Sequence, residues 1–292
     1  MQDQAGLDTL LAQSRRLSKG RRTERKMIGN QMVPPAASVV VVGLHASGSS
    51  SPQMADNTRF AELAENGYPG RVEVLFADGT ESTWNAGGCC RDKTSDDVAY
   101  LDSILQPFVD AGTRIAMFGQ SSGGMMALRY WYEGRHRVHA FGTQAASLSA
   151  PGDDFVLDEL RFPYPAHWIH WHGQADAVVP FSGRAGIGDR DRAELSEFVP
   201  VPAVIEMARA PAAAAVDRWR DRGPGNGVVT VYRTVPAERA NGDWRLRVRL
   251  LPGVDHDNQP KRWPSDRYSY PFRFLVNRSL AANDGLLGSP NR

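Results

Sequence analysis

The stretch "RIAMFGQSSGGMMALRY", residues 114–130, decides the fold of this chain. An apolar run ends in Gly-Gln-Ser-Ser-Gly-Gly, and a run with helical character follows it. This pattern predicts a buried strand, a sharp turn and a helix, with Ser121 displayed at the turn. A serine at such a turn has a strained backbone, so its neighbours two positions away must be small, as Gly119 and Gly123 are. Ser121 is therefore a candidate nucleophile, and the alternative interpretation is a glycine-rich turn without chemistry.

Strand-like and helix-like segments alternate on both sides of this stretch. Short apolar runs bounded by proline or glycine predict buried strands. They lie within residues 35–51, 71–79, 138–146, 166–173 and 244–253. Residues 96–112 have apolar side chains at three- and four-residue spacing between two aspartates and a glycine, which predicts an amphipathic helix. Residues 123–134 and 269–283 predict further helices. This alternation predicts an α/β fold whose sheet is mostly parallel and doubly wound, with helices on both faces.

The rhythm of strands and helices also suggests the domain organisation. Residues 1–30 are expected to form an N-terminal extension, and residues 31–292 a single domain. Residues 182–243 interrupt the rhythm, so we expect an excursion within that domain. Inside the excursion, residues 211–223 predict a helix and residues 227–235 predict a strand.

Composition excludes several classes of protein. The chain has 292 residues, of which 41% are hydrophobic, which is enough for a large core. Its net charge of +1 does not fit a nucleic-acid-binding protein. No run reaches the roughly 18 apolar residues that span a bilayer, so we expect no membrane partner. The basic cluster at residues 15–26 is interpreted as a solvated segment, with a weak membrane or partner contact as the alternative.

The first 30 residues and the cysteines bear on localisation. The N-terminal segment has no apolar signal core, so the chain is expected to be cytoplasmic as written, or secreted if a leader was removed. Its two cysteines, Cys89 and Cys90, are adjacent and cannot close an ordinary loop of the chain. We therefore expect no conventional intrachain disulfide to support the fold, which weakly favours a reducing compartment.

A serine nucleophile requires a histidine base oriented by a carboxylate. Of the seven histidines, only His256 lies in the last third of the chain, in the loop that follows a predicted strand. It is the candidate base, and the alternative is a solvated loop histidine. Asp176 follows another predicted strand and is the candidate acid, with turn capping as its alternative role. Asp255 is a poorer candidate because adjacent loop residues point apart.

An oxyanion intermediate would need two hydrogen-bond donors. The Ser122 amide is one candidate, and the other is an amide near Ala46 and Ser47, in the loop after an earlier strand. His45 is interpreted as a residue that shapes this loop, with a second base as the alternative. His170 and His172 alternate on a predicted strand without acidic or cysteine partners, so packing is favoured over a metal site.

Several segments together resemble a known family. They are "LHASGSS" (44–50), "TWNAGGCCRDKTSDDVAYLDSIL" (83–105), "GQSSGGMMAL" (119–128), "HGQADAVVPFSG" (172–183) and the late histidine loop. From Val39 to Ala282 the chain resembles the polyhydroxybutyrate depolymerase and feruloyl/acetylxylan esterase group, called carbohydrate esterase family one. The resemblance implies an α/β-hydrolase fold and an ester hydrolase without metal or other cofactor. It assigns the nucleophile to Ser121, the acid to Asp176 and the base to His256.

The chain departs from the family pattern at two places within the site. Ala46 stands where the family has glycine after the histidine, and the base lacks the usual Gly-Gly-His-x-Trp-Pro setting, because the Trp-Pro pair is displaced to Trp263. Trp84 and Trp263 are candidates for stacking on an acyl or phenolic group, with packing as the alternative. Gln120, beside the nucleophile, is a candidate pocket residue.

Three hypotheses for function follow. The first is a serine esterase that acts through an acyl-enzyme on short hydroxyacyl, acetyl or cinnamoyl esters, whether small molecules or oligomers. The second is an acyltransferase or thioesterase that uses the same triad, which the sequence does not separate from the first. The third is a non-catalytic binding protein, which the intact order of Ser121, Asp176 and His256 argues against. The sequence leaves the oligomeric state open.

Overall fold

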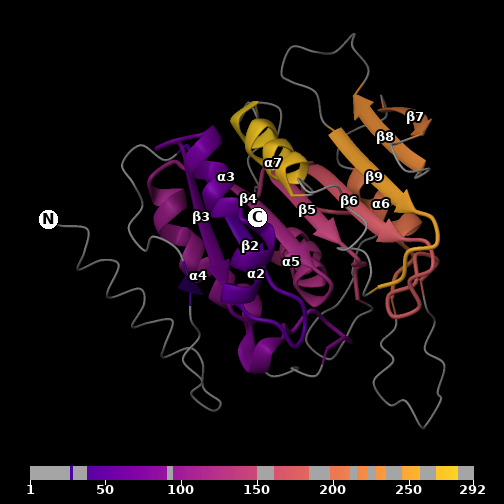
Figure 1. Cartoon of the computed structure of the whole chain (residues 1–292), viewed down its shortest axis with the longest axis horizontal. Helices are drawn as coiled ribbons and strands as arrows, with labels where there is room; N and C mark the ends of the chain where they lie inside the picture. The colour runs from indigo at the N-terminus through magenta and orange to yellow at the C-terminus, as the bar shows by residue number, and fades with distance from the viewer. Residues whose placement is uncertain are drawn as a thin grey trace, which may run out of the picture.

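The strands that the structure describes form one nine-stranded sheet at the centre of the protein (Figure 1). The computed structural model describes residues 27–28, 38–90, 95–149, 161–183, 198–210, 216–222, 228–234, 245–256 and 268–281. Within these residues the strand order is β1-β3-β2-β4-β5-β6-β9-β8-β7. The order runs outward in both directions from β2 and β4, which is the doubly wound arrangement predicted from the alternation of elements.

The middle of the sheet is parallel. Its strands are β2 (Val39–Leu44), β3 (Val72–Ala77), β4 (Arg114–Gln120), β5 (Ala140–Gln144), β6 (His167–Gly173) and β9 (Arg245–Leu251). Each pairs in parallel with its neighbour in this set. Parallel strands covered on both faces form near-continuous apolar runs, which is why β2 reads Val-Val-Val-Val-Gly-Leu and is buried throughout. All six match segments in which strands were predicted.

The edges of the sheet are antiparallel. β1 (Met27–Ile28) pairs with β3, so the end of the predicted N-terminal extension reaches the sheet. β7 (Val216–Arg222) and β8 (Val228–Thr234) pair with each other, and β8 pairs with β9. Figure 1 shows this hairpin on the side of the sheet opposite β3. The predicted strand within residues 227–235 is confirmed, and both strands of the excursion continue the central sheet.

The helix predicted over residues 211–223 is wrong where the structure describes it. Val216–Arg222 is the strand β7, and every one of its residues is paired with β8. The prediction rested on local composition, beginning with a run of alanines, and long-range backbone pairing overrides such local preferences.

Helices cover both faces of the sheet. They are α2 (Ser51–Thr58), α3 (Phe60–Gly67), α4 (Asp97–Asp110), α5 (Ser122–Glu133), α6 (Val201–Arg209) and α7 (Ser269–Ala281), with a short 3-10 turn η1 (Thr80–Ser82). The predicted helices α4, α5 and α7 are confirmed, whereas α2, α3 and α6 were not predicted. No helix among the described residues has the length and apolar character needed to cross a bilayer.

The two faces of the sheet carry separate cores. Val40, Val42 and Leu44 of β2 pack into a core with α4, α5 and α6. Val39 and Val41 pack into a second core with α2, α3 and α7. This division follows from the alternation of side chains along a strand, and it places helices on both faces as predicted.

Four of the parallel strands end at one edge of the sheet. The segments that follow β2, β4, β6 and β9 begin at His45, Ser121, Gln174 and Pro252. Because these strands run in the same direction, the segments after their carboxyl ends lie along the same edge. The candidate nucleophile, acid and base are therefore brought to one place by the topology.

Candidate active site

Ser121 occupies a strained turn between β4 and α5. Its φ of 49° and ψ of −119° are unfavourable for a residue with a side chain. The flanking glycines make the turn possible, since a Cβ on Gly119 would lie 2.2 Å from the Gly123 carbonyl oxygen, and one on Gly123 would lie 2.1 Å from the Leu44 carbonyl oxygen. The predicted sharp turn is confirmed, and its glycines are required by backbone packing.

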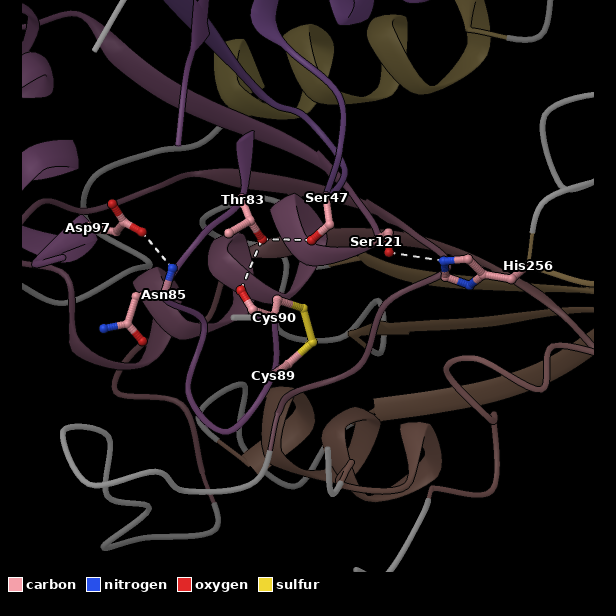
Figure 2. The surroundings of a disulfide bond; sticks show 8 residues. All are labelled: Ser47, Thr83, Asn85, Cys89, Cys90, Asp97, Ser121 and His256. Carbon is pink, nitrogen blue, oxygen red and sulfur yellow. Dashed lines mark hydrogen bonds between the residues drawn. A yellow bond between two sulfur atoms is a disulfide. The ribbon is translucent and has the colours of Figure 1, made fainter. Parts of the chain in front are cut away.

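The structure brings the candidate nucleophile, base and acid together. Ser121 Oγ lies 3.0 Å from His256 Nε2, and His256 Nδ1 lies 2.8 Å from Asp176 Oδ2 (Figure 2 shows the first pair). A carboxylate only accepts hydrogen bonds, so His256 donates from Nδ1. In the neutral ring, Nε2 is then an acceptor for the hydroxyl of Ser121. The proton positions follow from the heavy-atom contacts alone.

The acid is held rigidly by its own loop. The side chain of Asp176 has no exposed surface, whereas that of His256 is 14% exposed. Asp176 Oδ1 accepts hydrogen bonds from the amides of Val178 and Val179, at 3.0 and 2.8 Å. Its other oxygen is thereby turned toward the histidine. Turn capping and orientation of the base, which the sequence presented as alternatives, are both carried out by this one carboxylate.

Close backbone packing also joins the loops that carry acid and base. A Cβ on Gly173, at the end of β6, would lie 2.2 Å from the carbonyl oxygen of Val254. The amides of Gln174 and Ala175 donate to Leu251 and Val254 at 2.9 and 3.0 Å. These contacts set the separation between Asp176 and His256 through the main chain.

The β2 loop, residues 45–48, lies against the start of α5. The carbonyl oxygens of Leu44 and His45 lie 2.1 and 2.5 Å from the position that a Cβ on Gly123 would take, so the two segments are in contact. Among the described residues, the amides of Ala46, Ser47 and Ser122 find no hydrogen-bond acceptor. Unpaired amides beside a nucleophile are what an oxyanion site requires.

His45 has both ring nitrogens occupied. The Gly79 amide donates to Nε2 at 3.0 Å, so the ring proton is on Nδ1, which donates to the Ala46 carbonyl at 2.8 Å. The side chain is fully buried. These contacts match the interpretation of His45 as a residue that shapes the loop, and they leave no nitrogen for a second base.

Trp84 does not line a substrate pocket in this structure, which corrects the stacking interpretation. Its side chain is completely buried, and its indole Nε1–H donates to the His45 carbonyl at 2.9 Å. The adjacent Asn85 is also buried, and its backbone amide donates to Asp97 Oδ2 at 2.6 Å. Both residues therefore belong to the packing beneath the β2 loop.

The other two pocket candidates differ in outcome. The side-chain amide of Gln120 is half-buried and donates to the Tyr268 hydroxyl at 2.6 Å, with Gln144 Oε1 at 3.3 Å. Gln120 is thus committed to a polar cluster at the start of α7. Trp263 lies outside the described residues.

Cys89 and Cys90 are joined by a disulfide bond (Figure 2). Because the bond joins neighbouring residues, it is not a conventional, loop-closing disulfide of the kind that the sequence argues against. Cys90 has a φ of 75°, a left-handed turn conformation that lies outside the regular conformations assumed from the sequence. The bond closes no loop of the chain, so its consequence is local to the turn after Trp84.

A buried chain of hydrogen bonds supports the acid loop from below. His172 Nε2 lies 2.7 Å from the Val179 carbonyl and His172 Nδ1 lies 3.0 Å from His170 Nε2. His170 Nδ1 in turn lies 2.8 Å from the Thr143 hydroxyl. The Val179 carbonyl only accepts, so His172 donates to it from Nε2, and one proton on each ring satisfies every contact in the chain. Sequence reasoning favoured packing for these residues but did not detect that they support the acid loop.

Burial lowers the pKa of both histidines. Burial lowers the pKa of His170 well below its ordinary value, and the neighbouring His172 lowers it further. Burial also lowers the pKa of His172, although its contacts with Val179 and Asp176 oppose this shift.

No group of three or more histidine, cysteine or carboxylate side chains within the described residues is arranged to hold a metal ion.

Comparisons with known proteins establish the fold. No sequence model of a protein family matches the chain, and no curated protein matches it. Among solved structures, a phospholipase/carboxylesterase from Dyadobacter fermentans has a TM-score of 0.50 at 13% identity, over 88% of this chain and 99% of that chain. Thermogutta terrifontis esterase 2 phosphorylated by paraoxon has a TM-score of 0.50 at 14% identity, over 90% and 91%. With its mostly parallel, doubly wound sheet, the chain has the α/β-hydrolase fold.

Proposed function

We propose that the protein is a serine carboxylic-ester hydrolase in which Ser121 is the nucleophile, His256 the base and Asp176 the acid. The observation that carries the proposal is the pair of contacts at His256, 3.0 Å to Ser121 Oγ and 2.8 Å to Asp176 Oδ2. The serine stands at a strained turn at the carboxyl end of a parallel strand, where this fold presents a nucleophile.

The proton positions define the first chemical step. His256 Nε2 accepts the hydroxyl proton as Ser121 Oγ bonds to the ester carbonyl carbon, and Asp176 stabilises the imidazolium that forms. The same proton is then delivered to the leaving alkoxide, so the alcohol departs and an acyl-enzyme remains. In the second step His256 removes a proton from water, and hydrolysis returns Ser121 and a carboxylic acid.

The negative oxygen of each tetrahedral intermediate needs donors that do not have to reorganise. The Ser122 amide and the amides of Ala46 and Ser47 are proposed for this role. In support, these amides find no acceptor among the described residues, and the β2 loop contacts the start of α5. The His45 contact with the Ala46 carbonyl holds the peptide that follows.

The substrate class is proposed from the resemblance to carbohydrate esterase family one. Short hydroxyacyl, acetyl or cinnamoyl esters are the substrates that it implies. Burial of Trp84 removes one residue that was expected to recognise an aromatic acyl group, so a preference for cinnamoyl esters loses part of its support.

The proposal is tested with a covalent probe of Ser121 and with a series of ester substrates. Paraoxon, which phosphorylates Thermogutta terrifontis esterase 2, should transfer one diethylphosphoryl group to Ser121 and release 4-nitrophenol. Mass spectrometry of the labelled peptide identifies the residue. Hydrolysis rates for 4-nitrophenyl esters of increasing chain length, beside methyl ferulate, define the acyl group, and analysis of products with an added alcohol separates hydrolysis from acyl transfer. Label on another residue, or no ester turnover, would contradict the proposal.

A further inference from the structure

A chain of hydroxyl groups connects the β2 loop to the disulfide. Ser47 Oγ lies 2.7 Å from Thr83 Oγ1, and Thr83 Oγ1 lies 3.2 Å from the carbonyl oxygen of Cys90. Figure 2 shows this chain running from Ser47 to the pair of cysteines. We call residues 83–90 the cysteine loop. The β2 loop and the cysteine loop are thus joined at a point next to the proposed oxyanion site.

The direction of both hydrogen bonds is determined by their last member. The Cys90 carbonyl can only accept, so the Thr83 hydroxyl donates to it. Thr83 Oγ1 has then used its single proton, so Ser47 must donate to Thr83. The Thr83 side chain is buried, and replacing its hydroxyl by a methyl group would leave Ser47 without its acceptor and Cys90 without its donor.

Two further contacts tie the same segments together. The Trp84 indole donates to the His45 carbonyl at 2.9 Å, and the Gly48 amide donates to the Ser82 carbonyl at 2.9 Å. Trp84 and His45 are buried in the packing beneath the β2 loop. The hydroxyl chain differs from them because it ends at a carbonyl whose position depends on a bond that a reductant can break.

The disulfide closes a ring that contains the peptide between Cys89 and Cys90 and the Cys90 Cα, the atom to which this carbonyl group is attached. Cys90 adopts a φ of 75°, which costs about 1 kcal/mol or more for a residue with a side chain. The bond between neighbouring sulfur atoms ties Cys90 to Cys89, which is buried. Reduction removes this restraint and allows Cys90 to return to an ordinary backbone conformation. Cys90 is partly exposed, so a small reductant has access to it.

We propose that Thr83 is a positioning residue for the oxyanion amides of the β2 loop, and that the Cys89–Cys90 disulfide holds Thr83 in its working position. The oxidised protein is the more active form, and reduction lowers the turnover number. This inference rests on the proposed ester hydrolysis and assigns its regulation to a bond outside the triad. The affected step is stabilisation of the oxyanion, so kcat changes and KM does not.

The redox step requires a dithiol as co-reactant. One thiolate of the dithiol attacks a sulfur of the disulfide, forms a mixed disulfide and displaces the other cysteine as a thiolate. The second thiolate of the dithiol closes its own disulfide and releases the first cysteine. Two electrons and two protons pass to Cys89 and Cys90, and the dithiol leaves oxidised.

The first experiment compares the full chain before and after dithiothreitol treatment, with the reductant removed before the assay. Titration of thiols should rise from none to two per chain, because the sequence has two cysteines. We expect kcat on a 4-nitrophenyl ester to fall about tenfold while KM changes less than about twofold. The Cys89→Ala/Cys90→Ala double variant should show the kcat of the reduced protein and no response to dithiothreitol. It also supplies the reduced state if the bond resists native reduction.

The second experiment changes the link while keeping the disulfide. Thr83→Val has the same shape as threonine without the hydroxyl, so oxidised Thr83→Val should lose about tenfold in kcat and should no longer respond to dithiothreitol. Thr83→Ser restores the hydroxyl and should recover most of the lost turnover together with the response. A merely structural role would lower the melting temperature of Thr83→Val without producing this loss of response. If the double cysteine variant does not fold, the comparison of Thr83→Val with Thr83→Ser still tests the proposal.

The outcomes separate this inference from the proposed function. If oxidised wild type hydrolyses esters and kcat is unchanged by reduction, the proposed function stands and the positioning role is wrong. If Thr83→Val still responds to dithiothreitol as wild type does, the hydroxyl chain is not the route. If oxidised wild type hydrolyses no ester and paraoxon does not label Ser121, both proposals are overturned.

Discussion

The two sides of Ser121 are built by different means. On one side, the loops after β4, β6 and β9 are positioned by main chain packed against main chain, at glycines where a Cβ would lie within about 2.2 Å of another residue's backbone. On the other side, the β2 loop meets the main chain of α5 at Gly123, but most of its remaining ties are made by side chains, namely the Trp84 indole, the Thr83 hydroxyl and the His45 ring.

This difference indicates which parts of the site tolerate substitution and which do not. Backbone packing at glycine admits almost no substitution, so the placement of Ser121, Asp176 and His256 is set by the fold itself. Side-chain ties are weaker individually, about 1 kcal/mol each, and can be altered without unfolding the domain. We therefore expect changes on the triad side to abolish activity and changes on the β2 loop side to tune it.

The largest effect is expected for Ser121→Ala. Removing the proposed nucleophile should lower kcat/KM by about 10⁴ to 10⁶, because members of a triad act as a unit. The melting temperature should change little, since among the described residues the hydroxyl has a single hydrogen-bond partner, His256. Ser103→Ala, on α4, removes a hydroxyl bonded to the Tyr100 carbonyl and is the control. A Ser121→Ala variant with a tenth of wild-type activity would show that another residue attacks the ester.

Asp176→Asn comes next and tests which carboxylate orients the base. Asparagine preserves the shape but favours the wrong tautomer of His256, so kcat should fall by about 10³ to 10⁴. Asp255→Asn should reduce activity less, because the oxygen in contact with His256 Nδ1 belongs to Asp176. Rates and circular dichroism of both variants check this, and greater damage in Asp255→Asn at unchanged fold would overturn the assignment of the acid.

Gly123→Ala tests the main-chain side directly. The new Cβ would lie 2.1 Å from the Leu44 carbonyl oxygen, which forces α5 and the β2 loop apart. We expect about a hundredfold loss of kcat and a lower melting temperature. Gly67→Ala is the matched control, since nothing lies within 4 Å of its Cβ position and its φ is not positive. Equal behaviour of the two variants would mean that close packing at Gly123 does not position the site.

The same contrast explains how much the sequence could predict. The strands from Val39 to Leu44 and from Arg114 to Gln120, and the helix Asp97–Asp110, are encoded in contiguous patterns, and all were predicted. The juxtaposition of Ser121, Asp176 and His256 followed from their order and from strand direction. The positions of helices and strands and the order of the triad residues both depend on the course of the backbone, which residue patterns can predict.

The errors concern contacts between distant side chains or strands. The hydroxyl of Ser47 meets that of Thr83 across 36 positions, and no local pattern indicates this pairing. Trp84 was interpreted from its loop position, whereas its role depends on the His45 carbonyl, 39 positions away. The strand Val216–Arg222 likewise depends on pairing with β8. The sequence does show that Thr83 and Trp84 stand a few positions before the adjacent cysteines, and this closeness along the chain was the signal available for their structural role.

Trp84→Phe is expected to have a smaller effect than any triad change. Phenylalanine fills most of the space but leaves the His45 carbonyl without its donor, so kcat should fall severalfold with KM unchanged. Trp131→Phe is a matched control, because Trp131 is also fully buried and its indole donates to the Tyr164 carbonyl at 3.0 Å. Both variants should lose stability, and only Trp84→Phe should lose turnover. A raised KM for aromatic esters in Trp84→Phe would restore the stacking role that burial argues against.

The last prediction concerns stability against pH and tests whether the acid loop also rests on side chains. Burial lowers the pKa of His170 and of His172 in the folded protein below the ordinary value of 6.5. Well above pH 6.5 both histidines are neutral in the folded and in the unfolded chain, so the free energy of unfolding does not change with pH on their account. Below this pH the unfolded chain takes up protons that the folded chain does not, and the free energy of unfolding falls by up to about 1.4 kcal/mol per pH unit for each histidine.

The melting temperature of wild type should therefore fall between pH 6.5 and pH 5 more steeply than that of His170→Gln, which has one fewer group to titrate. His136→Gln is a suitable control, because His136 is a buried histidine bonded to the Asp102 carbonyl, far from the acid loop. Equal slopes for wild type and His170→Gln would show that His170 is protonated in the folded state, contrary to its contacts with Thr143 and His172. In that case the acid loop would depend only on its main-chain contacts, and the two sides of Ser121 would differ more sharply than we propose.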